Sequence, residues 1–397
     1  MATFEDKSMF SARSKKITPF AVMQLAHRAS ELEAIGQSVV HFEVGEPDFA
    51  TAEPVMAAAK QAIDAGRTKY TNAQGIPELR ERIAGYYAEQ GVEVASNRIL
   101  VTSGASGGLT LLSALLLNPD DELLITDPGY PCNDVFARLV GAQPKTIRVS
   151  AENRFQPTLD DFKGAWREQT KAALLASPGN PTGTMLAAHD LSAMVAHANQ
   201  NSGFIILDEI YQGLSHQEVA YSTGLAIEDD LYILNSFSKY FGMTGWRLGW
   251  VVVPDQAIKP ITKLAQNLFI SPNAPAQYAA LAAFDNAAMS IHEQRRRAFK
   301  RRATLLGDGL STLGFQIPVL PDGAFYHYVD ISHTGMASSD FCWKLIEEFQ
   351  VATTPGTDFG VHRADQYVRF AYTTSEEAII TGLERISQAL RVWGIAQ

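Results

Sequence analysis

The chain has 397 residues, of which 46% are hydrophobic and 19% are charged, and its formal net charge at pH 7 is −10. This length predicts two or three folding units or one large two-lobed enzyme, and the apolar share is enough for a sizeable core. The negative charge argues against nucleic acids and anionic membranes as partners.

Cysteine, histidine and hydropathy patterns exclude several further classes. The two cysteines, Cys132 and Cys342, form no CxxC pattern, so we expect neither a zinc site nor a disulfide framework. The nine histidines show no metal-ligand spacing, and we expect no metal. The first 20 residues lack the apolar stretch of a signal peptide, and no apolar run reaches the roughly 18 residues of a membrane span. We therefore expect a soluble, cytoplasmic protein.

Between about residues 95 and 255, short apolar strands alternate with amphipathic segments. Strands are predicted at RILVTSG, DELLITDPG, KAALLASPGN, GFIILDE, LYILNSFS and RLGWVVVP, with helices at ASGGLTLLSALLL, DVFARLVGA and AAHDLSAMVAHANQN. Strands that are apolar on both faces and separated by helices indicate a mostly parallel sheet covered on both sides. The predicted fold class is therefore α/β, with a large domain built on this sheet.

After about residue 285 the pattern changes to a long helical stretch, two short strands at GAFYHYVDI and YVRFAYT, and a closing helix from about Ser375. We interpret this as a smaller α/β domain. The predicted division is an N-terminal arm with part of the small domain over 1–45, a large domain over 46–285 and a small domain over 286–397. Six basic residues in the long helix would spread around its circumference, which favours a solvated helix over a nucleic-acid patch; they are Arg295, Arg296, Arg297, Lys300, Arg301 and Arg302.

Polar clusters follow five of the predicted strands at the point where each strand ends. They are Ser103–Ser106, Asp127–Asn133, Ser177–Gly183, Asp208–Tyr211 and Ser236–Lys239. Ligands of parallel sheets bind at the carboxyl ends of the strands. We therefore expect these clusters to form one site.

The last of these clusters contains a lysine with unusual neighbours. In NSFSKYFGMTGWRLGW, Lys239 follows an apolar strand and Arg247 comes eight residues later. In a partly dry site, Arg247 would lower the pKa of Lys239. A lysine kept neutral is a nucleophile toward carbonyl compounds.

Several motifs resemble one known family. SPGNPTG, DEIY, SFSK and GMTGWRLGW, in this order and spacing, resemble the class I aminotransferases of the pyridoxal-phosphate fold-type-I superfamily. HFEVGEPDF, TKYTNAQGIPELR, PDGAFY and YVRFAY extend the resemblance from about residue 18 to the C-terminus. The resemblance implies pyridoxal 5′-phosphate as cofactor and a ping-pong transfer of an amino group from an L-amino acid to a 2-oxo acid.

Such a cofactor needs a covalent anchor, a partner for its pyridine nitrogen, a cradle for its phosphate and walls for its flat ring. Lys239 is the expected anchor, and its freed amine can carry the substrate Cα proton. A strand-end aspartate taken alone is more often part of a turn or a helix cap, but beside Lys239 we expect Asp208 to face the pyridinium N–H. Tyr211 and Asn180 resemble the family pair that hydrogen-bonds the 3′-oxygen of the ring.

The phosphate needs positive charge and hydrogen-bond donors. Arg247 can bind it bidentately, and the Ser236 and Ser238 hydroxyls point the same way if their segment is extended. A helix opening after a strand presents its backbone N–H groups and the positive end of its dipole to an anion; the residues concerned are Gly104, Ala105 and Ser106. SGASGG lacks the GxGxxG spacing of a dinucleotide site, which disfavours an NAD-dependent dehydrogenase.

Other positions follow from the resemblance alone. Tyr130 resembles the aromatic that stacks on one face of the ring, although an ordinary loop tyrosine is equally compatible, and Ile210 would pack on the other face. Tyr70 matches a tyrosine that reaches the phosphate of the neighbouring subunit, which implies a homodimer with shared active sites. Arg369 would clamp the substrate α-carboxylate, with help from Asn180 and the Gly45 backbone.

The donor and the reaction leave alternatives open. Related enzymes that use acidic substrates can carry a lysine where this chain has Ser106, and the expected pocket offers apolar or aromatic side chains instead, which favours a neutral donor; these are Ile17, Phe20, Tyr130 and Phe325. A C–S lyase or another fold-type-I pyridoxal-phosphate enzyme would share the same site. A transcriptional regulator is disfavoured because about 45 residues ahead of GEPDF are too few for a winged helix and a linker.

Overall fold

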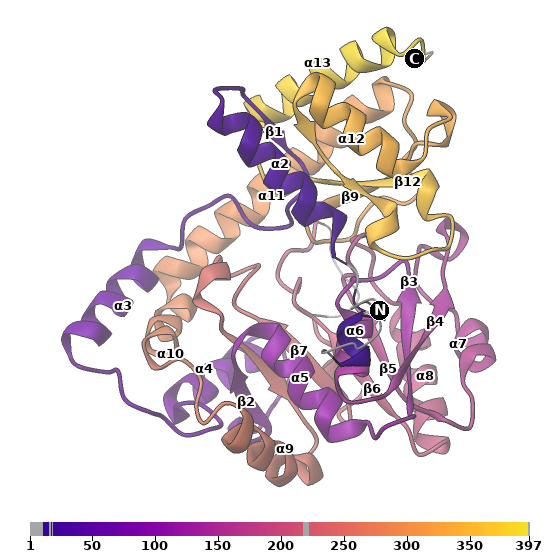
Figure 1. Ribbon diagram of the computed structural model, residues 1–397. Coiled ribbons are helices and arrows are strands. Elements are labelled where there is room, and N and C mark those ends of the chain that lie inside the picture. Colours follow the sequence, from indigo (N-terminus) through magenta and orange to yellow (C-terminus); the bar gives the residue numbers. More distant parts are fainter. Residues whose placement is uncertain (1–10, 16, 18, 217–221, 396–397) are drawn as a thin grey trace, which may run out of the picture.

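The computed structural model describes residues 11–15, 17, 19–216 and 222–395. It has a large lobe built around a seven-stranded sheet and a smaller lobe formed mainly by the C-terminal part of the chain (Figure 1). None of the described helices is long and apolar enough to cross a lipid bilayer.

The central sheet has the strand order β2-β8-β7-β6-β5-β3-β4. Strand β8 is antiparallel to both its neighbours, and every other pair is parallel. The strands are β2 (Ile99–Thr102), β3 (Glu122–Asp127), β4 (Gln143–Arg148), β5 (Thr170–Ala176), β6 (Phe204–Asp208), β7 (Tyr232–Ser236) and β8 (Gly249–Val252). The predicted α/β class with a mostly parallel sheet is confirmed, although β4 was not predicted because this edge strand is mostly exposed and polar.

Helices cover both faces of this sheet, which explains its apolar strands. Leu174 and Ile206 face a core shared with α5 and α9, whereas the next residues, Leu175 and Leu207, face a second core shared with α8. Alternate side chains of a strand point to opposite faces, so a strand buried on both faces must be apolar throughout. The helices of this lobe are α3 (Glu53–Asp64), α4 (Pro77–Ala88), α5 (Gly104–Leu116), α6 (Asn133–Leu139), α7 (Leu159–Ala165), α8 (Ala188–Gln200), α9 (Asp255–Leu268) and α10 (Ala274–Leu281).

The small lobe combines two small sheets with helices. Strand β1 (Val40–His41) pairs in parallel with β10 (Val351–Ala352), and β12 (Tyr367–Ala371) lies between β11 (Thr354–Pro355) and β9 (Tyr326–Asp330) in an antiparallel sheet. Its helices are α2 (Ala21–Ala34), α12 (Ser338–Phe349) and α13 (Glu376–Val392), and α11 (Asn286–Thr312) runs into it from the large lobe (Figure 1).

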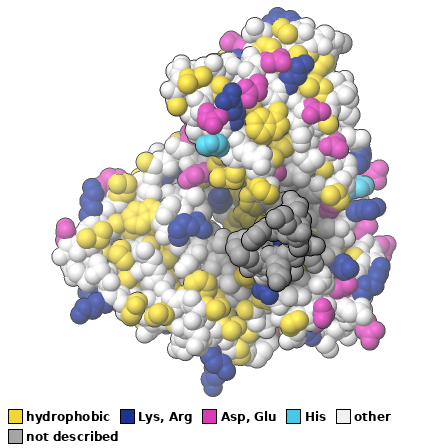
Figure 2. Space-filling view, in the orientation of Figure 1, with side chains coloured by type: hydrophobic (Ala, Val, Ile, Leu, Met, Phe, Trp, Pro, Cys, Tyr) yellow, Lys and Arg dark blue, Asp and Glu magenta, His cyan; other side chains and the backbone are white. Residues whose placement is uncertain are grey.

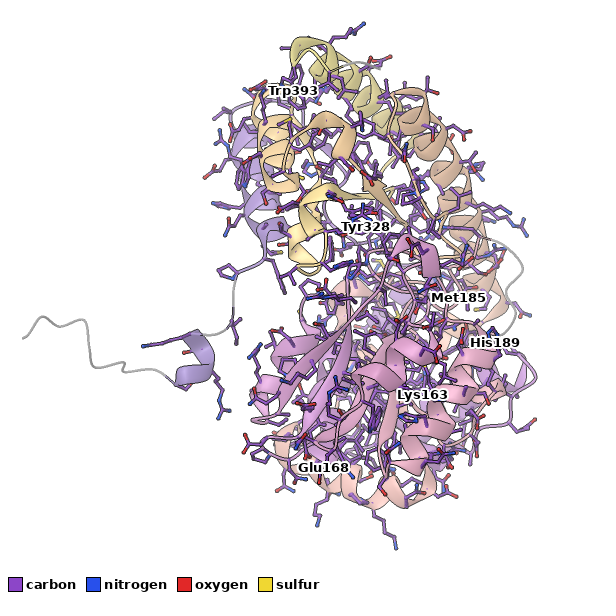
Figure 3. All side chains as sticks on the ribbon, turned by 90° about the vertical axis from the view of Figure 1, so that its right-hand side faces the viewer. Lys163, Glu168, Met185, His189, Tyr328 and Trp393 are labelled. Carbon is purple, nitrogen blue, oxygen red and sulfur yellow. The ribbon has the colours of Figure 1, made fainter. Side chains whose placement is uncertain are left out.

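The remaining elements are short. Helix α1 (Ala12–Lys15) lies beside the large lobe (Figure 3), where Arg13 Nη1 donates to Leu139 O at 2.7 Å. In the same view Tyr328 and Trp393 mark the small lobe, and Lys163 marks the large lobe. Single 3₁₀ turns are η1 (Ser96–Arg98), η2 (Ala151–Asn153), η3 (Gly224–Ala226), η4 (Thr244–Trp246), η5 (Ala282–Phe284), η6 (Ser332–Thr334), η7 (Gly356–Asp358) and η8 (Ala364–Gln366).

The predicted elements of the small lobe are present, with one correction in α11. The two predicted strands are β9 and β12, and Ser375 caps α13. The expectation of a fully solvated α11 is wrong for Arg302, which is buried and pairs with Asp48 at 2.8 Å. The reason is that α11 runs between the lobes. The domain boundaries at residues 45 and 285 stay a prediction.

Candidate active site

The carboxyl ends of the central strands meet the small lobe at a cavity of about 260 Å³. The molecular surface is hollowed where the lobes meet, and hydrophobic side chains gather beside the hollow (Figure 2). Most of the residues predicted for the site line this one cavity: Gly45, Ala105, Ser106, Tyr130, Asn180, Asp208, Ile210, Tyr211, Ser236, Ser238, Lys239, Arg247 and Arg369. The structure therefore brings together positions more than 300 residues apart in the chain.

Lys239 follows the carboxyl end of β7 and points into the cavity. Its Nζ donates a hydrogen bond to Gly45 O at 2.7 Å. Burial lowers the pKa of Lys239 to about 8, and this shift is opposed by Glu46 and reinforced by Arg369 and Arg247. The direction agrees with the sequence expectation, but burial is the main cause and Arg247 a lesser one. A lysine with this pKa has a much larger neutral fraction near physiological pH than an ordinary lysine has.

Asp208 ends β6 and is 5% exposed. Its Oδ1 accepts a hydrogen bond from Ile210 N at 3.1 Å. Burial raises the pKa of Asp208 to about 7, against the opposing effects of the Ile210 N–H and Lys239. A cationic N–H donor placed in the cavity would stabilise the ionised carboxylate.

Donors and positive charge gather where α5 begins. Gly104 has a φ of +68°, and a Cβ at this position would lie 2.7 Å from Arg247 Nη2. Only a glycine therefore lets the guanidinium come this close to the helix N-terminus. Ser236 Oγ donates to Ser238 Oγ at 2.9 Å. The Ser236 and Ser238 hydroxyls were expected to point the same way because their segment would be extended. The segment after Ser236 is instead a turn, yet both serines line the cavity.

Arg369 enters the cavity from β12 and is 4% exposed. Its hydrogen-bond acceptors are neutral oxygens: Nη1 donates to Asn180 Oδ1 at 2.9 Å, and Nη2 donates to Glu43 O and to Thr354 Oγ1. The buried Nε has no hydrogen-bond partner among the residues that the structure describes. Neutral acceptors leave the positive charge of this side chain for an anion in the cavity.

Aromatic rings fix this arginine and close the cavity beside it. The guanidinium carbon lies 4.3 Å from the centroid of Tyr326 and 4.8 Å from that of Phe359. Tyr326 Oη also lies 2.8 Å from Tyr211 Oη, and a Cβ at Gly45 would overlap it.

Sequence reasoning missed some of these residues and misplaced others. Tyr326 lines the cavity, whereas the predicted Phe325 is fully buried and does not. Both belong to PDGAFY, and the motif alone does not tell which neighbour faces the site. Ile17, which was expected in the donor pocket, is 44% exposed and does not line the cavity. Tyr70 was expected to act in the site of the neighbouring subunit, and that role stays a prediction; in the single chain it is 80% exposed.

Comparison with known proteins identifies the family. A family model described as aminotransferase class I and II matches residues 37–386. The chain belongs to this family. The predicted enzyme class is thereby confirmed: this protein is an aminotransferase, acting on amino acids and 2-oxo acids.

The relatives of this aminotransferase are named after different substrates. It is 36% identical over 388 residues to (5-formylfuran-3-yl)methyl phosphate transaminase of Methanocaldococcus jannaschii, covering 96% of this chain and 100% of that protein. It is 33% identical to valine–pyruvate aminotransferase of Mycobacterium tuberculosis, covering 94% of this chain and 97% of that protein. The structure of Thermus thermophilus aspartate aminotransferase with maleate matches with a TM-score of 0.90 at 34% identity, over 97% of this chain and 100% of that one.

Aminotransferases of this fold use pyridoxal 5′-phosphate, and the cavity of this aminotransferase fits that cofactor. Within the described part of the chain, the donor to the buried carboxyl of Asp208 is the neutral Ile210 N–H, which leaves this carboxyl free to pair with a cationic hydrogen-bond donor, and Lys239 offers an amine of lowered pKa. Because Gly104 has no side chain, Arg247 fits beside the N-terminus of α5, where a phosphate would be stabilised.

Proposed function

We propose that this aminotransferase transfers the amino group of a neutral L-amino acid to a 2-oxo acid, with Lys239, Asp208 and Arg369 as its principal working residues. The observation that carries the proposal is that a lysine of lowered pKa, a buried carboxyl and a buried arginine whose described hydrogen-bond partners are neutral line one cavity.

The chain's residues would hold the cofactor at three points. Lys239 Nζ would hold its aldehyde carbon, Asp208 its pyridine nitrogen, and Arg247 its phosphate. The phosphate would also meet the start of α5, at Gly104, Ala105 and Ser106, and the hydroxyls of Ser236 and Ser238. Tyr211 and Asn180 would contact the 3′-oxygen, and Tyr130 and Ile210 would pack on the two faces of the ring.

The cofactor supplies an electron sink when bound, and the protein supplies the proton transfers. Once the substrate amine has taken its place, Lys239 Nζ would be free to remove the substrate Cα proton and to deliver it to the carbon that carried the aldehyde of the cofactor. Its lowered pKa makes the neutral form available for this at neutral pH. Arg369 would hold the substrate α-carboxylate, and Asn180, its partner at 2.9 Å, would orient the guanidinium.

The rate of cofactor attachment gives a test of this role for Lys239. Attachment should accelerate as pH rises and level off above about pH 8, because the neutral amine is the nucleophile and the pKa of Lys239 is about 8. A solvent-exposed lysine would continue to gain rate toward about pH 10.4. Stopped-flow absorbance after mixing cofactor-free protein with pyridoxal phosphate measures this profile. A rate that rises steadily through pH 10 would contradict the assignment.

The expected donor class follows from the charges around the cavity. The basic side chains among its described lining residues are Lys239, Arg247 and Arg369, and each is already used by the cofactor or the α-carboxylate. Near Ser106 no further lysine or arginine lines the described part of the cavity. An acidic donor side chain would thus lack a cationic partner among the described lining residues, which costs a few kcal/mol, or roughly two orders of magnitude in kcat/KM.

Single-turnover rates with alanine, leucine, phenylalanine, aspartate and glutamate test this donor class. We expect the best neutral donor to exceed aspartate by about 100-fold in kcat/KM. Ser106→Lys is the matched variant, since it adds a cation at the cavity wall and should raise kcat/KM for aspartate about tenfold, near 1.4 kcal/mol. Aspartate exceeding every neutral donor by about tenfold in the unaltered protein would overturn the donor class.

We also propose that the protein works as a homodimer in which Tyr70 reaches the phosphate of the partner's site. Tyr70 is 80% exposed in the single chain and lies outside its own cavity, which supports this role. Tyr70→Phe should weaken cofactor retention about tenfold, through loss of one hydrogen bond to a charged group.

Hybrid dimers test the sharing of sites directly. A dimer of Tyr70→Phe with Lys239→Ala has one site with both defects and one site with neither, so mixing the two variants should restore activity. Lack of any restoration after subunit exchange, or an active monomer in sedimentation, would rule out the shared site.

A further inference from the structure

Helix α2 begins without a local cap. The first N–H groups of a helix have no partner inside the helix and are usually satisfied by a polar side chain at the N-cap. Here the N-cap is Phe20, and no side chain cap is formed there. The helix therefore depends on an acceptor from elsewhere in the chain.

Asp358 supplies that acceptor from 337 residues away. Its Oδ1 accepts from Ala21 N at 2.8 Å, and its Oδ2 accepts from Val22 N at 2.8 Å. A carboxylate with two charge-assisted hydrogen bonds at the positive end of a helix is a favourable arrangement. The interaction ties the first turn of α2 to η7 of the small lobe.

The residue that makes this tie belongs to the wall of the active site. Asp358 lines the cavity that contains Lys239 and Arg369. The next residue, Phe359, packs against the Arg369 guanidinium, and its carbonyl accepts a hydrogen bond from Gly129 N at 2.8 Å. Asp358, which caps α2, is therefore the direct neighbour of the residue that packs against Arg369, the proposed binder of the substrate α-carboxylate.

The first turn of α2 contributes apolar side chains to the same cavity. Phe20, Val22 and Met23 line it, although Met23 is 61% exposed. A side chain this exposed gains little from its own packing, so its position depends on the backbone of the turn. The backbone groups of that turn that bond to Asp358 are the N–H groups of Ala21 and Val22.

We propose that Asp358 is a positioning residue that holds the first turn of α2 as a wall of the donor side-chain pocket, and thereby favours long apolar donors over alanine. The inference rests on the proposed neutral donor class. Phe20 and Met23 line the cavity, so a long donor side chain that contacts them would lose this contact when the turn is released. The methyl group of alanine, the shortest donor side chain, would have the least contact to lose.

The experiment compares donors of increasing length in Asp358→Ala, with Asp358→Asn as the conservative variant. We expect Asp358→Ala to raise KM for leucine and phenylalanine about tenfold, near 1.4 kcal/mol, while KM for alanine changes less than about twofold and kcat less than about threefold. Asp358→Asn should give an intermediate loss, because its amide oxygen accepts one N–H where the carboxylate accepts two.

Ser375→Ala is the matched control. Ser375 Oγ caps α13 by accepting from Ala378 N at 3.1 Å, outside the cavity. This variant should lower the thermal stability of the protein and leave the ratio of leucine to alanine kcat/KM unchanged.

Two outcomes would overturn the inference: an equal loss for alanine and for leucine in the Asp358 variants, or the same change of ratio in Ser375→Ala. If Asp358→Ala does not fold, the ratio of leucine to alanine kcat/KM in Asp358→Asn tests the inference in its place. Preference of the unaltered protein for aspartate would contradict the donor class instead, and the leucine-to-alanine ratio would still report on Asp358.

Discussion

Lys239→Ala should abolish covalent attachment of the cofactor and lower the rate of amino transfer by at least about 10⁴-fold, because the nucleophile and the proton carrier are lost together. The cavity keeps its other contacts in this variant, since the only hydrogen bond that the Lys239 side chain makes among the described residues is to Gly45 O. Absorbance spectra and single-turnover rates with the preferred donor measure both effects.

Lys239→Arg is the matched control for charge. It keeps a cation of similar length at the end of β7, but a guanidinium does not deprotonate in proteins and cannot act as the nucleophile. We expect a loss as large as that of Lys239→Ala. Substantial activity in Lys239→Arg would show that the lysine acts through its charge alone.

The second large effect is expected for Asp208→Ala. This variant should retain part of its cofactor, because Arg247, Ser236 and the start of α5 remain, yet lose about 10²- to 10³-fold in the first half-reaction. The reason is that the cavity loses the carboxylate placed to keep the pyridine nitrogen protonated. Half-reaction rates at saturating donor, together with cofactor content, separate the two contributions.

Glu209→Gln provides a neighbouring comparison. Glu209 is fully buried, and its carboxyl accepts from Thr223 Oγ1 and Gly224 N rather than lining the cavity. The glutamine retains an acceptor for these donors, so we expect a rate change below about threefold. A first half-reaction in Asp208→Ala close to that of Glu209→Gln would contradict the role of Asp208.

The position of the site could be predicted because it depends on strand direction. Apolar runs in the sequence predicted strands β6 and β7. Asp208 is the last residue of β6, and Lys239 follows the end of β7. Parallel strands bring such ends to one edge of the sheet, so their proximity follows from the chain pattern. The family resemblance then added Arg369, which no local pattern would place in this cavity.

What the sequence could not provide depends on contacts between distant segments. The cap of α2 by Asp358 joins positions 337 residues apart and leaves no local signature. Tyr326 and Phe325 are neighbours of similar character, and only the packing of β9 decides which one faces the cavity. Arg302 was expected in solvent because its helix is highly charged, whereas the docking of the two lobes buries it against Asp48.

Peptide mapping after borohydride reduction identifies the lysine that holds the cofactor, since reduction makes the attachment of pyridoxal phosphate to its lysine permanent. We expect the modified peptide to contain NSFSKYFG and the label to lie on Lys239. Labelling of another lysine, with Lys239 unmodified in active protein, would contradict this assignment.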